Sequence, residues 1–213
     1  MQKMSEHFAG ALRIGIMECL VPYVARALEG PGEARLALKV SIGDTGTLVD
    51  KLRRNEIDAL LGFSVPRLAE LRIHDERSYE LGVVYSARLG PQGEPPFRIE
   101  DCLGLPLCLP DANLAVWPRL DAEIYRVHAE PQIVLRTNSI ALITDYVAAG
   151  KGISFLNWVD VAAGVAGGRL LFGKLDNRRL TEKLYLCGAT TTPLGSLQLE
   201  RARALFRQLP ASP

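Results

Sequence analysis

One stretch, RTNSIALITDYVAAGKGISFLN from Arg136 to Asn157, constrains the fold more than any other part of the chain. Ile140, Ile143 and Val147 recur at the spacing i, i+3 and i+7, which predicts the apolar face of an amphipathic helix. Gly150 follows this face. Because glycine readily adopts the left-handed backbone conformation, Gly150 is expected to end the helix. The stretch therefore predicts a helix with a defined stop, whose apolar face other elements must cover.

The start of this helix is predicted from its polar residues. Asn138 or Ser139 offers a side-chain oxygen to the first backbone N–H groups of the helix. Beyond the helix, the apolar run from Ile153 to Leu156 predicts a buried strand. Because the N–H groups at a helix start attract anionic and carbonyl oxygens, we expect this stretch to form one wall of a small-molecule site.

The charge balance argues against two classes of partner. The chain has 213 residues, with 25 Lys and Arg against 24 Asp and Glu, so its formal net charge is +1. Such a chain has no general attraction to nucleic acid or to an anionic membrane surface. The sequence has no run of about eighteen apolar residues and no export signal, so we expect a cytoplasmic protein.

The residue patterns predict no cofactor, no metal site and no catalytic group. Lys151 lies between two glycines, but no Gly precedes this Gly–Lys pair at phosphate-loop spacing and no Ser or Thr follows the lysine directly. An enzyme therefore stays only as an alternative to a binding protein. The cysteines lack the paired spacing of a zinc site and are interpreted as reduced core thiols or, alternatively, as including a redox sensor: Cys19, Cys102, Cys108 and Cys187.

Strands and helices alternate in the first part of the sequence, which indicates a doubly wound α/β fold. We expect strands at 12–16, 36–42 and 57–63 and helices at 20–28 and 47–55, with Thr45 as the N-cap of the second helix. The almost wholly apolar strand at 57–63 is expected to be buried on both faces, as parallel strands are. Later expected elements are strands at 81–86, 105–109, 133–135, 170–175 and 184–189 and helices at 117–125 and 197–209.

Four segments, LRIGIM, VSIGDTGTLVDKLRRNEIDALLGF, LCLPDANL and TNSIALITDYVAAGKGISFL, occur in this order. Together they resemble the effector-binding domain of LysR-type transcriptional regulators, over about Leu12 to Leu209. The resemblance implies a type 2 periplasmic-binding-protein-like fold, which is α/β with two doubly wound lobes joined by two crossover strands. It implies a linker remnant at 1–11, lobe 1 at 12–87 and 186–213, lobe 2 at 88–185, and crossovers near 83–88 and 184–189.

The function implied by this resemblance is that of a ligand-sensing regulatory domain. Such a domain binds a small metabolite between its lobes and relays closure to a winged helix-turn-helix, which does not fit into the residues before Leu12. DNA would then be bound only through that missing N-terminal domain. A stand-alone solute-binding protein of the same fold is the alternative, and it would normally carry an export signal. Asn157 departs from the family, which usually has a proline at this position.

Candidate effector-binding residues follow from the resemblance and from the rule that ligands bind at the carboxyl ends of parallel strands. Thr45 and Ser139 could equally be helix caps alone. The carboxylate of Glu18 could be held by helix N–H groups, or it could receive a cationic group of the effector. Phe63 could pack in the core or stack on a ligand, as could Trp158. The candidates are Met17, Glu18, Cys19, Thr45, Thr47, Phe63, Ser64, Asp111, Asn113, Asn138 and Ser139.

The expected effector is a small acid, most simply a carboxylate, with an amine-bearing acid as the leading class. The resemblance also implies a homodimer, or a tetramer of the full-length protein, in which the helix at 20–28 of one protomer packs against 158–165 of its partner. Apolar residues expected near the surface there are Val21, Val24, Trp158, Val161 and Val165.

Overall fold

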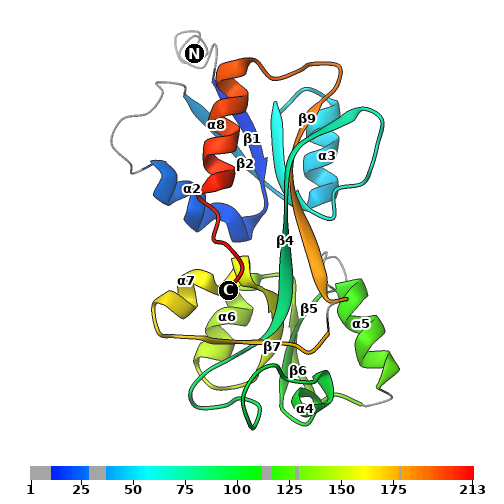
Figure 1. Ribbon diagram of the computed structural model, residues 1–213, viewed down its shortest axis with the longest axis vertical. Helices are drawn as coiled ribbons and strands as arrows, with labels where there is room; N and C mark the ends of the chain where they lie inside the picture. The colour runs from blue at the N-terminus through cyan, green and yellow to red at the C-terminus, as the bar shows by residue number, and fades with distance from the viewer. Residues whose placement is uncertain (1–10, 29–36, 112–116, 128–129, 178) are drawn as a thin grey trace. The chain divides into compact units, whose positions relative to one another are not determined.

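The computed structural model describes residues 11–28, 37–111, 117–127, 130–177 and 179–213 (Figure 1). The chain forms two compact units: unit 1 is Met1–Arg77 with Lys183–Leu209, and unit 2 is Ser78–Glu182 with Pro210–Pro213. Two strands, β4 (Leu71–Tyr85) and β9 (Thr181–Ala189), each contribute residues to both units. The units divide after residues 77 and 182, whereas the expected lobe boundaries lie after 87 and 185.

Unit 1 contains a sheet in which β2 (Leu38–Ile42), β1 (Leu12–Ile16), β3 (Ala59–Phe63) and β9 lie side by side (Figure 1). β1 pairs in parallel with both β2 and β3, as expected for a doubly wound fold. β3 is buried throughout, but it pairs antiparallel with β9. The predicted burial of this strand is confirmed, and it is parallel to β1 on one side only, because an apolar run reports burial and not the direction of each partner strand.

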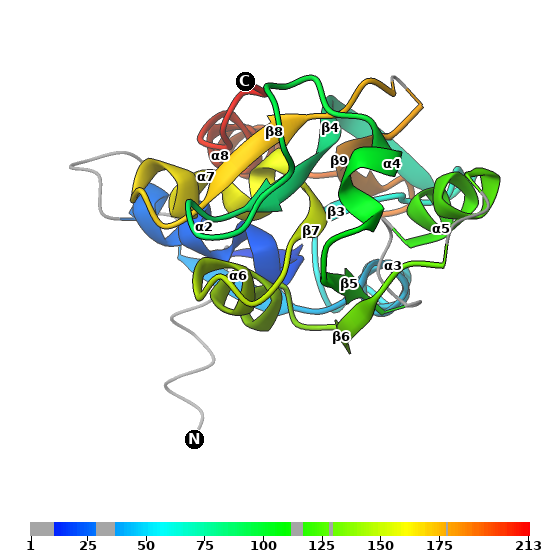
Figure 2. The ribbon, with the colours of Figure 1, turned by 90° about the horizontal axis from the view of Figure 1, so that it is seen from below.

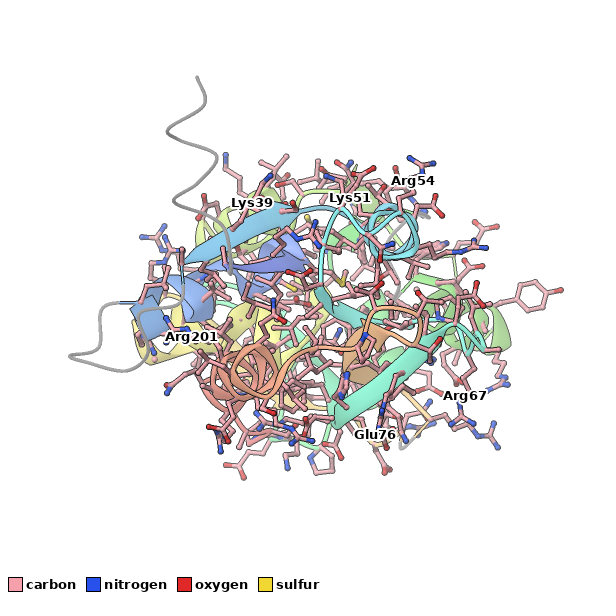
Figure 3. The ribbon with its side chains drawn as sticks, turned by 90° about the horizontal axis from the view of Figure 1, so that it is seen from above. Lys39, Lys51, Arg54, Arg67, Glu76 and Arg201 are labelled. Atoms are coloured by element: carbon pink, nitrogen blue, oxygen red, sulfur yellow. The ribbon has the colours of Figure 1, made fainter. Side chains whose placement is uncertain are left out.

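The helices of unit 1 cover this sheet: α2 (Val21–Leu28), which follows the short 3-10 helix η1 (Glu18–Leu20), then α3 (Thr45–Arg53) and α8 (Ser196–Arg207). Leu48 and Leu52 of α3 are fully buried, as predicted from their spacing. Figure 3 shows Lys51 and Arg54 at the carboxyl end of α3. Basic side chains there interact favourably with the negative end of the helix dipole.

Unit 2 is built on three strands that run in parallel. β5 (Leu107–Pro110) pairs in parallel with β6 (Ile133–Thr137), and Leu107 forms a parallel bridge to Ile153, just before β7 (Ser154–Asn157). The carboxyl ends of these three strands consequently share one edge of the unit. β4 pairs antiparallel with β7 and with β8 (Leu171–Lys174).

The helices described in unit 2 are α4 (Ile99–Leu103), α5 (Trp117–Arg126), α6 (Ile140–Ala148) and α7 (Trp158–Ala166). α5 and α6 lie on opposite sides of the β5–β6 pair (Figures 1 and 2). Ile143 and Val147 of α6 are fully buried, and Gly150 adopts φ +73°, so the predicted helix and its stop are confirmed.

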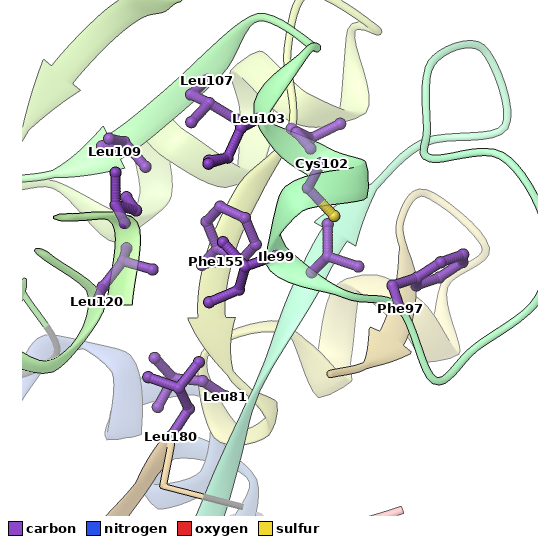
Figure 4. Close-up of a cluster of buried hydrophobic side chains, with 13 residues drawn as sticks. Leu81, Phe97, Ile99, Cys102, Leu103, Leu107, Leu109, Leu120, Phe155 and Leu180 are labelled. Atoms are coloured by element: carbon purple, nitrogen blue, oxygen red, sulfur yellow. The ribbon is translucent and has the colours of Figure 1, made fainter. Parts of the chain in front are cut away.

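The core of unit 2 contains a cluster of apolar side chains from β4, α4, β5, α5 and β7 (Figure 4). Phe155 of β7 lies in this cluster and is fully buried. Burial of such a side chain contributes about 1.5–3 kcal/mol to the free energy of unfolding. The cluster therefore holds β5 and β7 together and fixes the edge at which their carboxyl ends lie.

Strand β4 is much longer than the strand expected at 81–86. It starts at Leu71 and ends at Tyr85. Its first half alternates between exposed and half-buried residues, and the stretch from Leu81 to Val84 is buried. A strand with a solvated half has no continuous apolar signal, which explains why only its end is predicted.

Candidate functional site

Three predicted site residues come together in unit 1, at the ends of β1 and β3 and at the start of α3. The Thr45 hydroxyl donates a hydrogen bond to the Phe63 carbonyl oxygen at 2.8 Å, and its Oγ1 lies 3.7 Å from the Met17 sulfur. The backbone N–H of Phe63 points to the same sulfur, with 3.2 Å between nitrogen and sulfur. Met17, Thr45 and Phe63 thus connect the carboxyl ends of β1 and β3 with the start of α3.

The cap of α3 is Asp44 and not Thr45, which corrects the sequence-based assignment. One carboxylate oxygen of Asp44 accepts the Thr47 N–H at 2.8 Å, and the other accepts the Thr47 hydroxyl at 2.8 Å. Thr45 is unsuited to this role because it is the first residue of the helix and its hydroxyl turns to Phe63. The backbone hydrogen bond from Thr47 lowers the pKa of Asp44 most, followed by the bond from the Thr47 hydroxyl.

The other candidates of unit 1 differ in exposure. Glu18 is exposed, and no helix N–H group of the described residues holds its carboxylate. Ser64 is also exposed, with φ +51°, and Cys19 is half-buried. Phe63 is buried, which supports core packing over stacking on a ligand.

In unit 2, Asp111, Thr137 and Ser139 meet at the carboxyl ends of β5 and β6. The Asp111 N–H donates to the Thr137 carbonyl at 2.9 Å, and the Ser139 N–H donates to the Thr137 hydroxyl at 3.2 Å. Thr137 is not among the predicted residues, because the strand is expected from the sequence to end two residues earlier. Asn138 is exposed, and the predicted residue Asn113 lies outside the described residues.

Ser139 is the cap of α6, since its Oγ accepts the Leu142 N–H at 3.3 Å. This cap is neutral, and α6 has no acidic residue in its first turn. Its last turn contains no basic residue either. The N-terminus of α6 therefore keeps the partial positive charge that attracts an anion.

A second polar group of unit 2 is not predicted by the sequence. Glu182 on β9 has only 1% of its surface exposed, and its Oε2 accepts a hydrogen bond from Asn157 Nδ2 at 2.7 Å. Arg119 of α5 pairs with Oε1 of the same carboxylate at 3.3 Å. Asn157 is the last residue of β7, so this group lies at the same edge of the parallel strands as Ser139.

Burial explains the state of three cysteines. Cys102, Cys108 and Cys187 are free and buried, and burial raises the pKa of each thiol to about 12. At neutral pH these thiols are protonated and poorly nucleophilic. The structure therefore supports core packing for the three of them.

The sequence of residues 5–211 matches the family described as the LysR substrate binding domain. The chain belongs to this family. No curated protein matches the sequence. A LysR substrate-binding domain has the type 2 periplasmic-binding-protein-like fold, so the predicted fold class and family are confirmed.

Solved structures of the same fold are similar to this LysR substrate-binding domain. The Synechocystis PCC6803 CcmR regulatory domain in complex with 2-PG has a TM-score of 0.75 and 16% identity, covering 93% of this chain and 96% of that chain. The effector-binding domain of QuiR in complex with shikimate has a TM-score of 0.69 and 14% identity, covering 93% and 94%. The sulfate-bound regulatory domain of an OxyR2 mutant from Vibrio vulnificus has a TM-score of 0.73 and 15% identity, covering 95% and 98%.

Family membership settles the broad function. This protein is a ligand-sensing regulatory domain of a LysR-type transcriptional regulator, which disfavours the alternative of a stand-alone solute-binding protein. Domains of this family are regulatory rather than catalytic, and LysR regulators are DNA-binding oligomers. Among the described residues, no helix is long and apolar enough to cross a membrane.

Proposed function

We propose that this domain senses a small acid that also carries an amine. The observation that carries the proposal is the difference between two helix starts: α3 is capped by the carboxylate of Asp44, whereas α6 is capped by the neutral Ser139. The start of α6 in unit 2 thus offers positive partial charge, and the start of α3 in unit 1 offers negative charge.

The acid group is assigned to the edge of unit 2 at α6. Ser139 accepts the Leu142 N–H, but the N–H groups of Ile140 and Ala141, at the start of the same helix, have no partner among the described residues. Orphan N–H groups at a helix start bind carboxylates and other anions. Shikimate and sulfate, which the similar QuiR and OxyR2 structures hold, are both anions, and this supports an anionic effector.

The amine is assigned to the edge of unit 1 near α3. The carboxylates of Glu18 and Asp44 are both exposed there, and Glu18 has no described partner. The Thr45 hydroxyl already donates its proton to Phe63, so it is left as an acceptor. Acceptors of this kind favour an ammonium or another N–H donor over a second carboxylate.

A thermal-shift screen tests the proposal with matched compounds: an amino acid, the corresponding acid without the amine, and the corresponding amine without the acid. We expect the amino acid to raise the melting temperature of the domain most, because ligand bound to the native state stabilises it by mass action. If the amine-free acid stabilises equally well across the series, the amine assignment is wrong.

Variants then assign each group by calorimetry. Ser139→Ala should weaken binding of the acid by about 1–2 kcal/mol, the scale of a lost hydrogen bond to a charged group. Thr45→Ala should weaken binding by a similar amount. Glu18→Gln should remove the preference for the amine. Thr144→Ala is the control, because its hydroxyl bonds to the Ala141 carbonyl within the same helix α6. If Ser139→Ala and Thr45→Ala both keep wild-type affinity, the effector does not bind at the starts of α6 and α3, and the proposal is wrong.

We also propose that the effector is bound and released without chemical change. The ligand-sensing role of the family supports this. Prolonged incubation of the domain with a stabilising ligand, followed by mass spectrometry, should recover the ligand intact. The cytoplasm stays the predicted location.

A homodimer is proposed as well, on a revised surface. Val24 and Val161 are buried in the protomer, and Trp158 packs edge-on against Phe172 with ring centroids 5.2 Å apart. The expected patch is therefore wrong in part, because the apolar faces of α2 and α7 cover their own units. Among the exposed large apolar residues of unit 1, three lie on α2 and on the edge strand β2: Leu28, Val40 and Ile42.

Sedimentation velocity tests this surface. Ile42→Lys should shift the domain to monomer at tens of micromolar, because a charge replaces an apolar contact at the interface. Leu197→Lys on α8 is the matched control, since Leu197 and Ile42 are both 57% exposed. Equal dissociation in the two variants, or a wild-type domain that sediments as a monomer, would contradict the proposal.

A further inference from the structure

We infer that Arg119 binds the anionic group of the effector and that the buried carboxylate of Glu182 holds Arg119 in position. The inference rests on the proposed function, because it names a further residue that recognises the acid. It concerns unit 2 alone, and all the residues that carry it belong to that unit.

The contacts form a chain from the core to the surface. Asp160 of α7 accepts the backbone N–H of Asn157 at 3.1 Å, which fixes the start of α7. Asn157 in turn donates its side-chain N–H to Glu182 at 2.7 Å. Glu182 pairs with Arg119 at 3.3 Å, and the side chain of Arg119 is 44% exposed. The buried side chains of Asn157 and Glu182 thus connect the start of α7 to a guanidinium that solvent can reach.

The position of Arg119 in the fold agrees with an anion-binding role. Arg119 lies in the first turn of α5, the helix that follows β5. Asn157 ends β7, and Ser139 follows the end of β6. Because β5, β6 and β7 run in parallel, Arg119, Asn157 and Ser139 belong to the edge at which ligands of such sheets bind.

The burial of Glu182 is hard to explain by stability alone. Removing a carboxylate from water costs several kcal/mol, and apolar residues of similar volume in place of a buried ion pair are often as stable or more stable. A buried carboxylate does, however, fix the direction of an arginine. The guanidinium has five N–H donors in a rigid fork, and the structure gives it one partner among the described residues, Glu182. The remaining donors suit a carboxylate, sulfate or phosphate oxygen.

The experiment separates binding from structural support. Arg119→Gln leaves the buried carboxylate of Glu182 with one partner fewer. The stability of the domain and its affinity for the anion should therefore both fall. Adding Glu182→Gln in the double variant removes the buried charge and restores stability. The probe is inorganic sulfate, titrated at constant ionic strength with chloride, and the midpoint of stabilisation is followed by thermal shift. We expect the double variant to bind sulfate about tenfold more weakly than wild type, or weaker still.

Two further variants complete the test. Arg98→Gln is the control, because Arg98 pairs with Glu100 at the same 3.3 Å in unit 2 but on an exposed surface, and its sulfate midpoint should not change. Arg119→Lys keeps the charge pair with Glu182 and loses the fork, so it should fold like wild type and still bind sulfate several-fold more weakly.

Two results would overturn the inference: a wild-type domain that sulfate does not stabilise beyond chloride, or a folded double variant with a wild-type midpoint. Neither result decides the proposed function. That proposal fails separately, when no member of the amino acid, acid and amine series stabilises the wild-type domain.

Discussion

Two helices, α3 in unit 1 and α6 in unit 2, start after strands that run in parallel with their neighbours, yet their N-termini differ in charge. α3 is compensated at both ends, by Asp44 at its cap and by Lys51 and Arg53 in its last turn. α6 has a neutral cap, no acidic residue in its first turn and no basic residue in its last turn. The comparison teaches that the fold supplies the helix start, whereas one side chain decides whether that start still attracts an anion.

One charged pair from each unit shows a second difference, which is the burial of its carboxylate. In unit 1, Arg13 pairs with Asp58, and both side chains keep contact with solvent, at 36% and 13% exposure. In unit 2, Glu182 is 1% exposed and its partner Arg119 is 44% exposed. Of these two pairs, only the second has one fully buried member, and a buried charge constrains its partner more strongly than a solvated one.

The largest effect on stability is expected for Asn157→Ala. This change removes the amide that donates to the buried carboxylate of Glu182, so the free energy of unfolding should fall by about 2–3 kcal/mol, the scale of a hydrogen bond to a charged group. Urea denaturation measures the difference. Asn138→Ala, at an exposed position of the same edge, should stay within about 0.5 kcal/mol of wild type. Similar losses of stability in Asn157→Ala and Asn138→Ala would contradict a special role for the buried bond to Glu182.

Ser139→Asp makes the cap of α6 resemble that of α3. The new carboxylate should bind the first N–H groups and repel an anionic effector, so affinity for the acid should fall about tenfold or more, a loss of about 1.4 kcal/mol. The free energy of unfolding should rise by a few tenths of a kcal/mol. Ser139→Asn keeps a neutral cap and should keep most of the affinity. Calorimetry on the two variants compares them, and equal affinity would show that the charge of the cap is irrelevant.

Local sequence determined α6 well and α3 less well. Ser139 and Gly150 bound the predicted helix α6, because its apolar stripe, cap and stop are all within one short stretch. At α3, Asp44 and Thr45 are adjacent and both suit an N-cap. The choice depends on the Phe63 carbonyl, which is distant in sequence and accepts the Thr45 hydroxyl. Such a tertiary partner cannot be predicted from a local pattern.

The burial of Glu182 is even harder to predict from a local sequence pattern. The sequence TEKLYLCGA of β9 contains Glu182 between Thr181 and Lys183, which is also how a solvated strand end looks. Its burial depends on Asn157 and Arg119, which come from other elements of the chain. In the sequence, Asn157 stands out only as a departure from the family's usual proline. Its role becomes visible once the structure pairs it with Glu182.

The pH dependence of the two caps should differ. The pKa of Asp44 is lowered in the native state, so its contribution to stability is complete above the pKa of an unfolded Asp and is lost as the pH falls through the native pKa. Asp44→Ala should therefore cost about 1 kcal/mol at neutral pH and less at low pH. Ser139→Ala should cost a similar amount at all pH values, because a hydroxyl does not titrate. Urea denaturation at neutral and acidic pH measures both, and parallel curves would contradict the assignment.

The smallest effect is expected for Thr47→Ala, which removes one of the two bonds from Thr47 to Asp44. The backbone N–H at 2.8 Å remains, and the hydroxyl at 2.8 Å is lost. Because the backbone bond contributes most to the lowered pKa of Asp44, this pKa should rise only part of the way to its ordinary value. The free energy of unfolding should fall by a few tenths of a kcal/mol, since the position is exposed. An NMR titration of the Asp44 carboxyl carbon measures the pKa, with Thr144→Ala as the control. A return of the pKa to its ordinary value would show that the hydroxyl, and not the helix N-terminus, holds this carboxylate, and α3 would then lose its contrast with α6.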